Sequence, residues 1–114
     1  MSVRQQMNAS MAEVIADRFR LLAEPIRIRI LDSLREGPLT VGELAREVST
    51  SQQNVSKHLG LLHRAGLLRR EKDGNSVRYG IADESVFALC DEVCGGIQRH
   101  LNELRSTMEE GVTR

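Results

Sequence analysis

One stretch, Thr40 to Gly66, TVGELAREVSTSQQNVSKHLGLLHRAG, restricts the fold of this chain more than any other. Thr40 and Glu43 form the T-x-x-E pattern of a capping box, which predicts that a helix begins at Val41. A serine-threonine-serine run then interrupts the apolar spacing and offers hydroxyl caps for a second helix, from about Gln52 to Ala65. The glycine that follows is suited to the C′ position of that helix. The stretch therefore predicts two short helices joined by a tight turn.

The second of these helices carries polar side chains opposite its apolar stripe. That stripe is formed by Val55, Leu59, Leu62 and Ala65, which recur at helical spacing. The glutamine, asparagine, serine and lysine side chains of its first two turns are of the kinds that bind base edges and phosphates of DNA. A solvated amphipathic helix in an ordinary bundle would show the same pattern. The helix alone leaves both interpretations open.

A β-hairpin is predicted at residues 67–82, directly after the second helix. Val77, Tyr79 and Ile81 alternate with smaller or polar residues, as in a half-buried strand, and Asp73-Gly74-Asn75 is predicted as the turn. A helix-turn-helix followed by a basic hairpin is the winged-helix arrangement, in which hairpin arginines and lysines can lie along phosphates. The sequence thus predicts a mainly α-helical winged helix-turn-helix fold, with about five helices and a two-stranded wing.

The residues expected to contact DNA lie in the helix-turn-helix, residues 40–66, and in the wing. They are Thr40, Ser51, Gln52, Gln53, Asn54, Ser56, Lys57, His58, Arg64, Arg69, Arg70, Lys72, Asn75 and Arg78. Gln53 and Asn54 are predicted to read bases, and the basic side chains, Lys72 and Arg78 among them, to hold phosphates. For His58, packing within the fold and contact with a phosphate are both open.

The charge of the chain is unevenly distributed, although 16 basic residues balance 16 acidic ones. Residues 51–80 hold six basic and two acidic residues, a net charge of +4, whereas residues 81–114 hold three basic and seven acidic ones, a net charge of −4. The positive charge therefore coincides with the second helix and the hairpin, as in the local footprint of a DNA-binding surface. The balanced total predicts modest non-specific affinity for DNA.

The remaining elements are predicted to be helices within one domain, residues 1–114. Residues 1–9 are polar and are expected to fray. Apolar spacing predicts helices at about 10–23, at 26–35 after a proline, and at about 84–110.

The chain has no apolar run long enough to span a membrane and no secretory signal, which predicts a cytoplasmic protein without membrane contacts. The sequence motifs of common hydrolases, P-loop proteins and metalloproteases are missing, so no enzyme is expected.

The first and last of these helices carry more apolar surface than one small domain needs to bury, which predicts an obligate homodimer. The expected interface residues are Met11, Ile15, Phe19, Phe87, Cys90, Cys94, Ile97, Leu101, Leu104 and Met108. Those on the last helix are spaced alternately three and four residues apart, as in a heptad seam.

Cys90 and Cys94 occupy successive positions of that seam, one helical turn apart on one face. Two thiolates so placed can approach one soft ion, such as As(III), Sb(III), Cd(II) or Zn(II). Free cysteine also packs like a small apolar residue, so interface packing explains the pair as well. A redox or persulfide switch on the same pair, and a protein without any effector, are the further alternatives.

Several motifs resemble those of the ArsR/SmtB family of bacterial winged-helix repressors, over roughly residues 15 to 83. Ser51 to Leu59, SQQNVSKHL, is similar to the family's S-Q-x-x-V-S-x-H-L recognition helix, and residues 22–27, LAEPIR, are similar to its opening motif. The resemblance implies a homodimer that binds operator DNA and is released by an effector. A Cys-x-Cys arsenic site is missing, because its place is taken by residues 43–47, ELARE. A winged-helix module that binds a protein instead of DNA is the more remote alternative.

Overall fold

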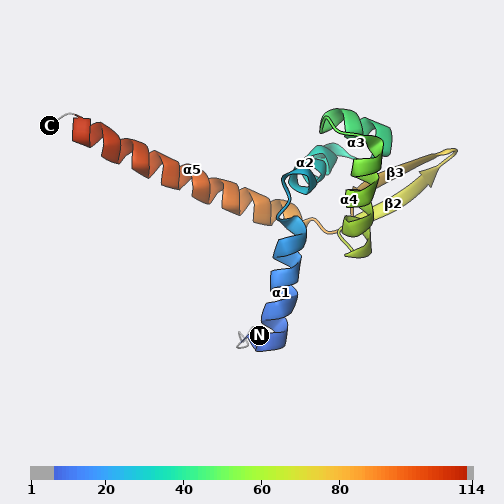
Figure 1. Cartoon of the computed structure of the whole chain (residues 1–114), viewed down its shortest axis with the longest axis horizontal. Helices are drawn as coiled ribbons and strands as arrows, with labels where there is room; N and C mark the ends of the chain where they lie inside the picture. The colour runs from blue at the N-terminus through green and yellow to red at the C-terminus, as the bar shows by residue number, and fades with distance from the viewer. Residues whose placement is uncertain (1–6, 113–114) are drawn as a thin grey trace. The chain divides into compact units, whose positions relative to one another are not determined.

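The computed structural model describes residues 7–112 of the chain as five α-helices, a 3₁₀ turn and three strands (Figure 1). In chain order these are α1 (Ala9–Leu22), α2 (Pro25–Ser33), the 3₁₀ turn (Leu34–Glu36), β1 (Leu39–Thr40), α3 (Val41–Glu47), α4 (Gln52–Arg64), β2 (Leu68–Asp73), β3 (Ser76–Ile81) and α5 (Ser85–Val112). The chain divides into two compact units, one that ends at Ala82 and one that begins at Asp83. The first unit is the predicted winged helix-turn-helix, and the second is built on α5.

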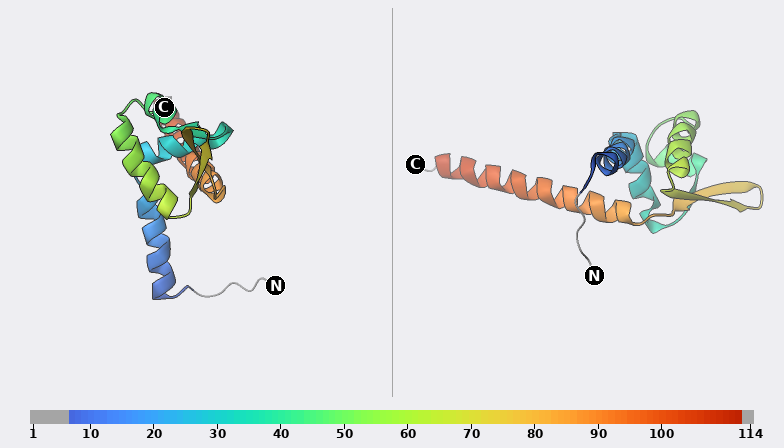
Figure 2. Two further views of the ribbon diagram at one scale, coloured as in Figure 1. Left: turned by 90° about the vertical axis from the view of Figure 1, so that its right-hand side faces the viewer. Right: turned by 90° about the horizontal axis from the view of Figure 1, so that it is seen from below.

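The sheet of the first unit has three antiparallel strands in the order β1-β3-β2. Strands β2 and β3 form the predicted hairpin, which projects beyond α3 and α4 (Figures 1 and 2). Strand β1 adds a third member, with Leu39 paired to Tyr79 and Thr40 to Arg78. The sequence did not predict β1, because a strand of two residues is too short to show alternation.

An aliphatic core lies between the helices and the base of the hairpin. Its most completely buried side chains are Ile30, Leu31, Leu44, Val55, Leu59, Leu62 and Leu67. The predicted stripe of α4 supplies three of them, whereas Ala65 at its end is half-buried. Burial of a leucine or isoleucine side chain contributes about 1.5–3 kcal/mol to the free energy of folding. The buried side chains of α4 therefore hold this helix against the core.

The ends of α3 and α4 follow from local side-chain chemistry. Thr40 Oγ1 accepts from the Glu43 backbone N–H (3.1 Å), and Glu43 Oε1 accepts from the Thr40 N–H (2.8 Å), so the predicted capping box is present. Ser51 Oγ caps α4 by accepting from the Asn54 N–H at 3.1 Å. Gly66, with φ +83°, ends α4 at the C′ position as predicted.

Elsewhere the helix ends differ from the predicted ones by a few residues. Helix α1 begins at Ala9, because the Asn8 side chain accepts from the Met11 N–H at 2.8 Å. The expected fraying of residues 1–9 concerns, for residues 1–6, a part of the chain outside the described residues. Helix α2 tightens after Ser33 into the 3₁₀ turn, which leads into the Gly37-Pro38 stop.

Helix α5 makes up the second unit and extends two residues beyond its predicted end. The Asp83 carboxylate accepts from the Ser85 N–H (3.0 Å) and hydroxyl (2.6 Å), close to its predicted capping role. Large apolar side chains along this helix are about half exposed, namely Val93, Ile97, Leu101 and Leu104, and Met108 is more exposed than these. Within residues 7–112 no helix combines the length and the apolar character that a membrane crossing requires.

Candidate nucleic-acid interface

The first turns of α4 present a row of polar side chains to solvent. Gln52, Gln53, Ser56 and Lys57 are exposed, while the buried stripe of the same helix faces the core. Asn54 differs from these four, because it is half-buried and its Nδ2 donates to Thr50 Oγ1 at 3.2 Å. The row can therefore offer amide, hydroxyl and ammonium groups to a duplex without unfolding any part of the helix-turn-helix.

The predicted contacts Thr40 and Ser51 stand at helix starts, where their hydroxyl oxygens accept capping hydrogen bonds. Each hydroxyl keeps its proton, which it can donate to a phosphate oxygen. Arg64 at the end of α4 is exposed, and so is Asn75 in the turn of the hairpin.

The hairpin separates its basic side chains onto two faces. Arg70 is paired with Tyr79 and Lys72 with Val77, so the side chains of these four residues share one face. Arg70 Nε donates to Tyr79 Oη at 3.2 Å, and both Arg70 and Lys72 are exposed. The His63 ring, at the end of α4, meets the Tyr79 ring edge to face, with 6.3 Å between ring centres. This face carries positive charge directly beside α4.

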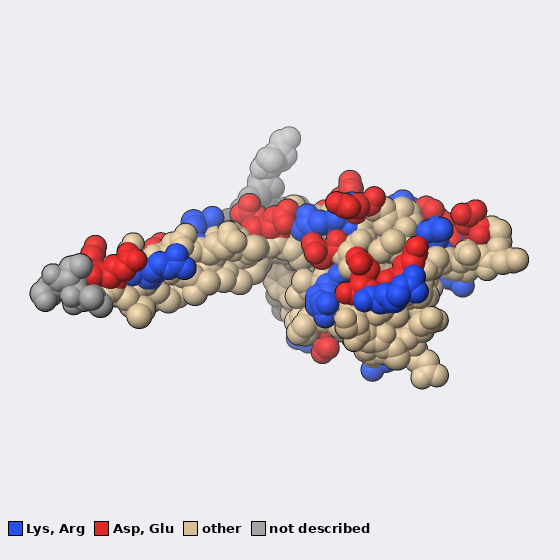
Figure 3. All heavy atoms as spheres, turned by 90° about the horizontal axis from the view of Figure 1, so that it is seen from above, with Lys and Arg blue, Asp and Glu red and all other residues tan. Residues whose placement is uncertain are grey.

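The opposite face of the hairpin carries arginines that are paired with carboxylates. Arg69 Nε donates to Glu71 Oε2 at 2.6 Å, and Arg69 also donates to the Ile81 carbonyl oxygen. Arg69 lies so close over Gly80 that a Cβ there would come within 3.2 Å of the guanidinium. Figure 3 shows Lys and Arg atoms beside Asp and Glu atoms on the surface of the winged-helix unit. Arg69 could reach a phosphate only by leaving these partners.

Arg78 ties the same face of the hairpin to the start of α3. Its guanidinium lies 3.5 Å from Glu43 Oε1 and 3.8 Å from Asp73 Oδ2. The pKa of the Glu43 carboxyl is lowered, chiefly because the Thr40 backbone N–H donates to it and in part because Arg78 is close. Arg78 is therefore already engaged by two carboxylates, which compete with the phosphate contact predicted for it.

His58 differs from the other predicted contacts of α4, because the structure places its side chain in the interior and not in the exposed polar row. Only 6% of its surface is exposed, and its Nδ1 accepts from Arg27 Nε at 3.0 Å. Burial lowers the pKa of His58, and the nearby charges of Arg27 and Lys57 lower it further. This burial agrees with the packing alternative considered for His58 and not with a phosphate contact in this conformation. Its position in the helical pattern agrees with this, since it lies three positions after the buried Val55 and four before the buried Leu62.

Arg27 and Arg18 are structurally important residues that the sequence did not single out. Arg27 also donates through Nη1 to the Leu21 carbonyl oxygen (2.8 Å), and Arg18 donates to the Ala65 carbonyl oxygen (3.3 Å). Arg18 thereby connects α1 with the C-terminal end of α4. A basic residue among apolar ones, as in IRIRI, is a weak signal that could have drawn attention to Arg27.

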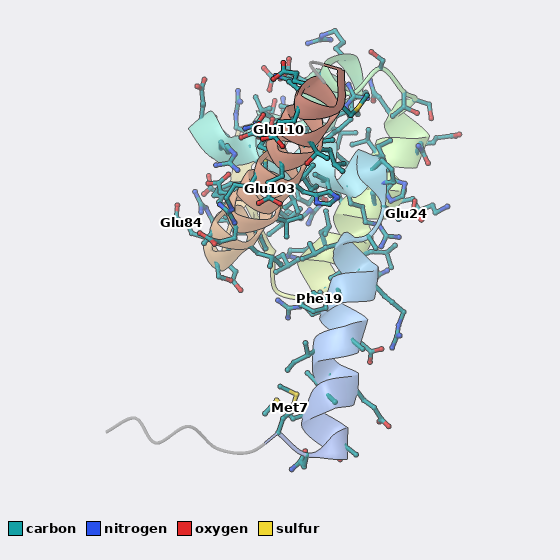
Figure 4. All side chains as sticks on the ribbon, turned by 90° about the vertical axis from the view of Figure 1, so that its left-hand side faces the viewer. Met7, Phe19, Glu24, Glu84, Glu103 and Glu110 are labelled. Carbon is teal, nitrogen blue, oxygen red and sulfur yellow. The ribbon has the colours of Figure 1, made fainter. Side chains whose placement is uncertain are left out.

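The residues predicted for dimerisation leave apolar surface open on α1 and on α5. Met11 and Phe19 are each 53% exposed and Ile15 is half-buried; Figure 4 shows Phe19 projecting from α1. On α5 the exposure rises from the half-buried Phe87 to Met108, which is 70% exposed. Apolar patches of this kind are typical of surfaces that another chain covers.

Cys90 and Cys94 are free thiols on α5, the first half-buried and the second exposed. Within residues 7–112, no three histidine, cysteine, aspartate or glutamate side chains of one chain lie together as a metal-binding group. One chain thus offers a soft ion two sulfur ligands and no third side-chain ligand, at least among the described residues.

The comparisons with known proteins agree with this geometry. The sequence profile of a helix-turn-helix domain family matches residues 22–71. The chain is 36% identical over 96 residues to Rv0081, an uncharacterized helix-turn-helix transcriptional regulator of Mycobacterium tuberculosis. The aligned residues make up 83% of this chain and 84% of the relative. The crystal structure of Rv0081 is similar, with a TM-score of 0.76 at 35% identity over 84% of this chain and 97% of that one.

Two further solved structures are similar to this chain, and the functions of their own proteins are described more specifically. The antimony-specific transcriptional repressor AntR has a TM-score of 0.75 at 30% identity, over 87% of this chain and 90% of its own. The homodimeric winged helix-turn-helix DNA-binding domain of Mb0332 from Mycobacterium bovis, a possible ArsR-family regulator, has a TM-score of 0.73 at 27% identity, over 90% and 95%.

Proposed function

The chain belongs to the ArsR/SmtB family of winged helix-turn-helix transcriptional regulators, and on this premise we propose that it acts as a homodimeric repressor of a near-palindromic operator. The family consists of DNA-binding regulators and not of enzymes. The observation that carries the proposal is the exposed polar row of α4 beside a positively charged wing. A recognition helix reads the major groove with such side chains, while basic groups of the wing position it on the backbone.

The proposed contacts differ in what they contribute. Gln52 and Gln53 are assigned to base edges, because a glutamine amide can both donate and accept toward adenine. Lys57, Arg70 and Lys72 are assigned to phosphates, because they are exposed and basic and lie on α4 or on the face of the hairpin beside it. Asn54 can join the base contacts if its amide gives up the Thr50 hydroxyl.

Fluorescence anisotropy tests this function with a duplex taken from upstream of the gene that encodes the chain. We expect the protein to bind this duplex more tightly than a scrambled one, and Gln53→Ala to reduce the difference by about 1–3 kcal/mol. Gln98→Ala is the matched control, because it removes an exposed glutamine from α5 and should leave the preference unchanged. Equal binding of both duplexes by the unmutated protein would refute sequence-specific function and favour a protein-binding module.

A homodimer is supported by the apolar surface left open on α1 and α5 and by the homodimeric state of the Mb0332 domain. An isologous pair carries two copies of α4 related by a two-fold axis. The operator should therefore contain two half-sites about one helical turn apart.

A thiol-binding effector is the second part of the proposal, and Cys90 and Cys94 are its candidate site. The two thiols fit a soft ion such as As(III), Sb(III), Cd(II) or Zn(II) in donor type, and the similarity to an antimony-specific repressor supports this class. Because one chain supplies only two ligands, the partner subunit or solvent would complete the set. A redox or persulfide switch at the same pair would also act through these thiols.

A further inference from the structure

A hydrogen-bonded connection links the recognition helix α4 to α1 and α2 inside the winged-helix unit. The Arg27 side chain on α2 donates through Nε to His58 Nδ1 (3.0 Å) and through Nη1 to the Leu21 carbonyl oxygen (2.8 Å) in the last turn of α1. His58 lies on α4, next to Lys57 and five positions after Gln53. We call the Arg27 side chain, the His58 ring and the Leu21 carbonyl the α4 latch.

The latch requires a neutral His58. An arginine side chain can only donate, so Nδ1 must keep its lone pair in order to accept from Arg27. A second proton on the ring would place two donors and two positive charges against each other at 3.0 Å. Three charged groups act on the ring: Arg27 from α2 and Lys57 from α4 disfavour the proton, and Glu24 before α2 favours it. Burial, the largest influence, also disfavours the charged form.

We propose that the α4 latch sets the orientation of the recognition helix, and that protonation of His58 opens it and weakens operator binding in mildly acidic solution. The inference rests on the proposed DNA-binding function. Arg27 and His58 act through α4 and not by touching DNA, so they are positioning residues. Since α4 also carries Gln53 and Lys57, a displacement at His58 moves the side chains that are assigned to the duplex.

The direction of the effect separates the latch from ordinary electrostatics. Exposed histidines gain positive charge on acidification, which strengthens attraction to phosphates. A loss of affinity at low pH is therefore opposite in sign to the general trend.

The test compares three proteins, each binding the duplex from upstream of the gene at about pH 7.5 and at a series of values down to about pH 5, because burial moves the protonation of His58 below the usual pKa of histidine. We expect the Kd of the unmutated protein to rise progressively toward the acidic end of this series, approaching a loss of about tenfold once His58 is protonated, the scale of one lost hydrogen bond to a charged group. His58→Asn keeps an acceptor near the position of Nδ1 but does not titrate, so its Kd should rise far less. His63→Asn is the matched control and should keep the loss of affinity.

Two results would overturn the latch: an affinity of the unmutated protein that stays constant or rises on acidification, or an equal loss in His58→Asn. If the unmutated protein shows no preference for the duplex at about pH 7.5, the proposed function fails instead. In that case, the pH dependence of thermal unfolding tests the latch independently of DNA binding. A histidine whose pKa is lowered by folding binds more protons when unfolded, so stability should fall as the pH drops below about 6.5. Equal falls in the unmutated protein and His58→Asn would contradict the latch without reference to DNA.

Discussion

At the scale of single residues, the two faces of the wing divide its basic side chains by role. Arg70 and Lys72 are exposed on the face beside α4, whereas Arg69 and Arg78 are held by carboxylates on the other face. A guanidinium that is already paired gains less from a phosphate, because it must first give up its partner. The sequence alone did not distinguish these four residues, because each is a basic residue of the same predicted hairpin.

We therefore expect Lys72→Ala and Arg78→Ala to differ, although each removes one positive charge from the same hairpin. Lys72→Ala should weaken binding of operator and scrambled duplexes alike and lower the slope of log K against log[salt] by about one. Arg78→Ala should leave that slope nearly unchanged and lower the melting temperature instead, because it frees Glu43 and Asp73. Anisotropy at a series of salt concentrations measures the slope. Equal slopes in the two variants would return Arg78 to the phosphate contacts.

The residues that sequence analysis placed correctly are those whose role depends on near neighbours in the chain. Thr40 and Glu43 cap α3 because they stand three positions apart, and this spacing is visible without a structure. His58 and Arg27 are 31 positions apart, so their hydrogen bond depends on how α2 packs against α4. The polar row of α4 could be predicted, but the partner of His58 on α2 could not.

At the scale of elements, the turn between α3 and α4 contains the one residue other than glycine with a left-handed backbone among residues 7–112. Ser49 has φ +55°, and the Thr50 N–H after it donates to the Ala45 carbonyl oxygen at 3.1 Å. The end of α4 uses the same geometry with a glycine, Gly66, where the Leu67 N–H donates to the Leu62 carbonyl oxygen at 3.1 Å. Any residue with a Cβ is strained in this conformation.

Ser49→Gly is accordingly expected to stabilise the protein by about 0.5–1 kcal/mol, because the strain it relieves exceeds the extra entropy of glycine in the unfolded chain. Gly66→Ser places the same residue type at the equivalent position after α4 and should destabilise by a similar or larger amount. Urea denaturation of the two variants measures both changes. If Ser49→Gly lowers the denaturation midpoint, the serine side chain contributes something to the turn that outweighs its strain.

Element lengths also show where local signals end. The strands β2 and β3 could be predicted from alternation, whereas β1 forms only because Leu39 and Thr40 lie beside β3 in the folded unit. The Arg78 side chain extends this contact to Glu43 at the start of α3. Pairing of this kind depends on the tertiary fold and leaves no trace in a two-residue segment.

At the scale of the whole molecule, the long helix α5 carries more apolar surface than it buries. Ile97, Leu101 and Leu104 are each about half exposed along one seam, and Figure 4 shows Glu84, Glu103 and Glu110 along the same helix. A seam of alternate three- and four-residue spacing is suited to pairing with a second helix. The heptad spacing was visible in the sequence, but the sequence could not say which surface stays uncovered in one chain.

Leu101→Glu should convert the proposed dimer to monomers and abolish operator binding, because it places a charge in the centre of the seam. Asn102→Glu adds the same charge one position off the seam and is the matched control, which should remain dimeric. Light scattering at micromolar concentration measures the molar mass, and anisotropy measures binding. A monomer in the unmutated protein, or a dimer in Leu101→Glu, would exclude this interface.

The two cysteines join the seam to the proposed regulation. A heptad seam normally takes leucine, isoleucine or valine, and packing alone does not explain why Cys90 and Cys94 occupy two successive positions. An ion that binds both thiols must deprotonate them and draw them together, which would alter the seam and with it the spacing of the two recognition helices. A ligand that favours the DNA-free form by about 1–3 kcal/mol would lower operator affinity about 5- to 150-fold.

Titration of the DNA complex with As(III), Sb(III), Cd(II), Zn(II) and a persulfide donor should therefore release the unmutated protein with at least one of these reagents. The double variant Cys90→Ser/Cys94→Ser should keep its DNA under the same conditions, because serine hydroxyls are poor ligands for soft ions. A response to the persulfide donor alone would assign the pair to redox regulation. If no reagent releases the unmutated protein, or if the double variant responds equally, the cysteines serve only to pack the interface, and the repressor acts without an effector at this site.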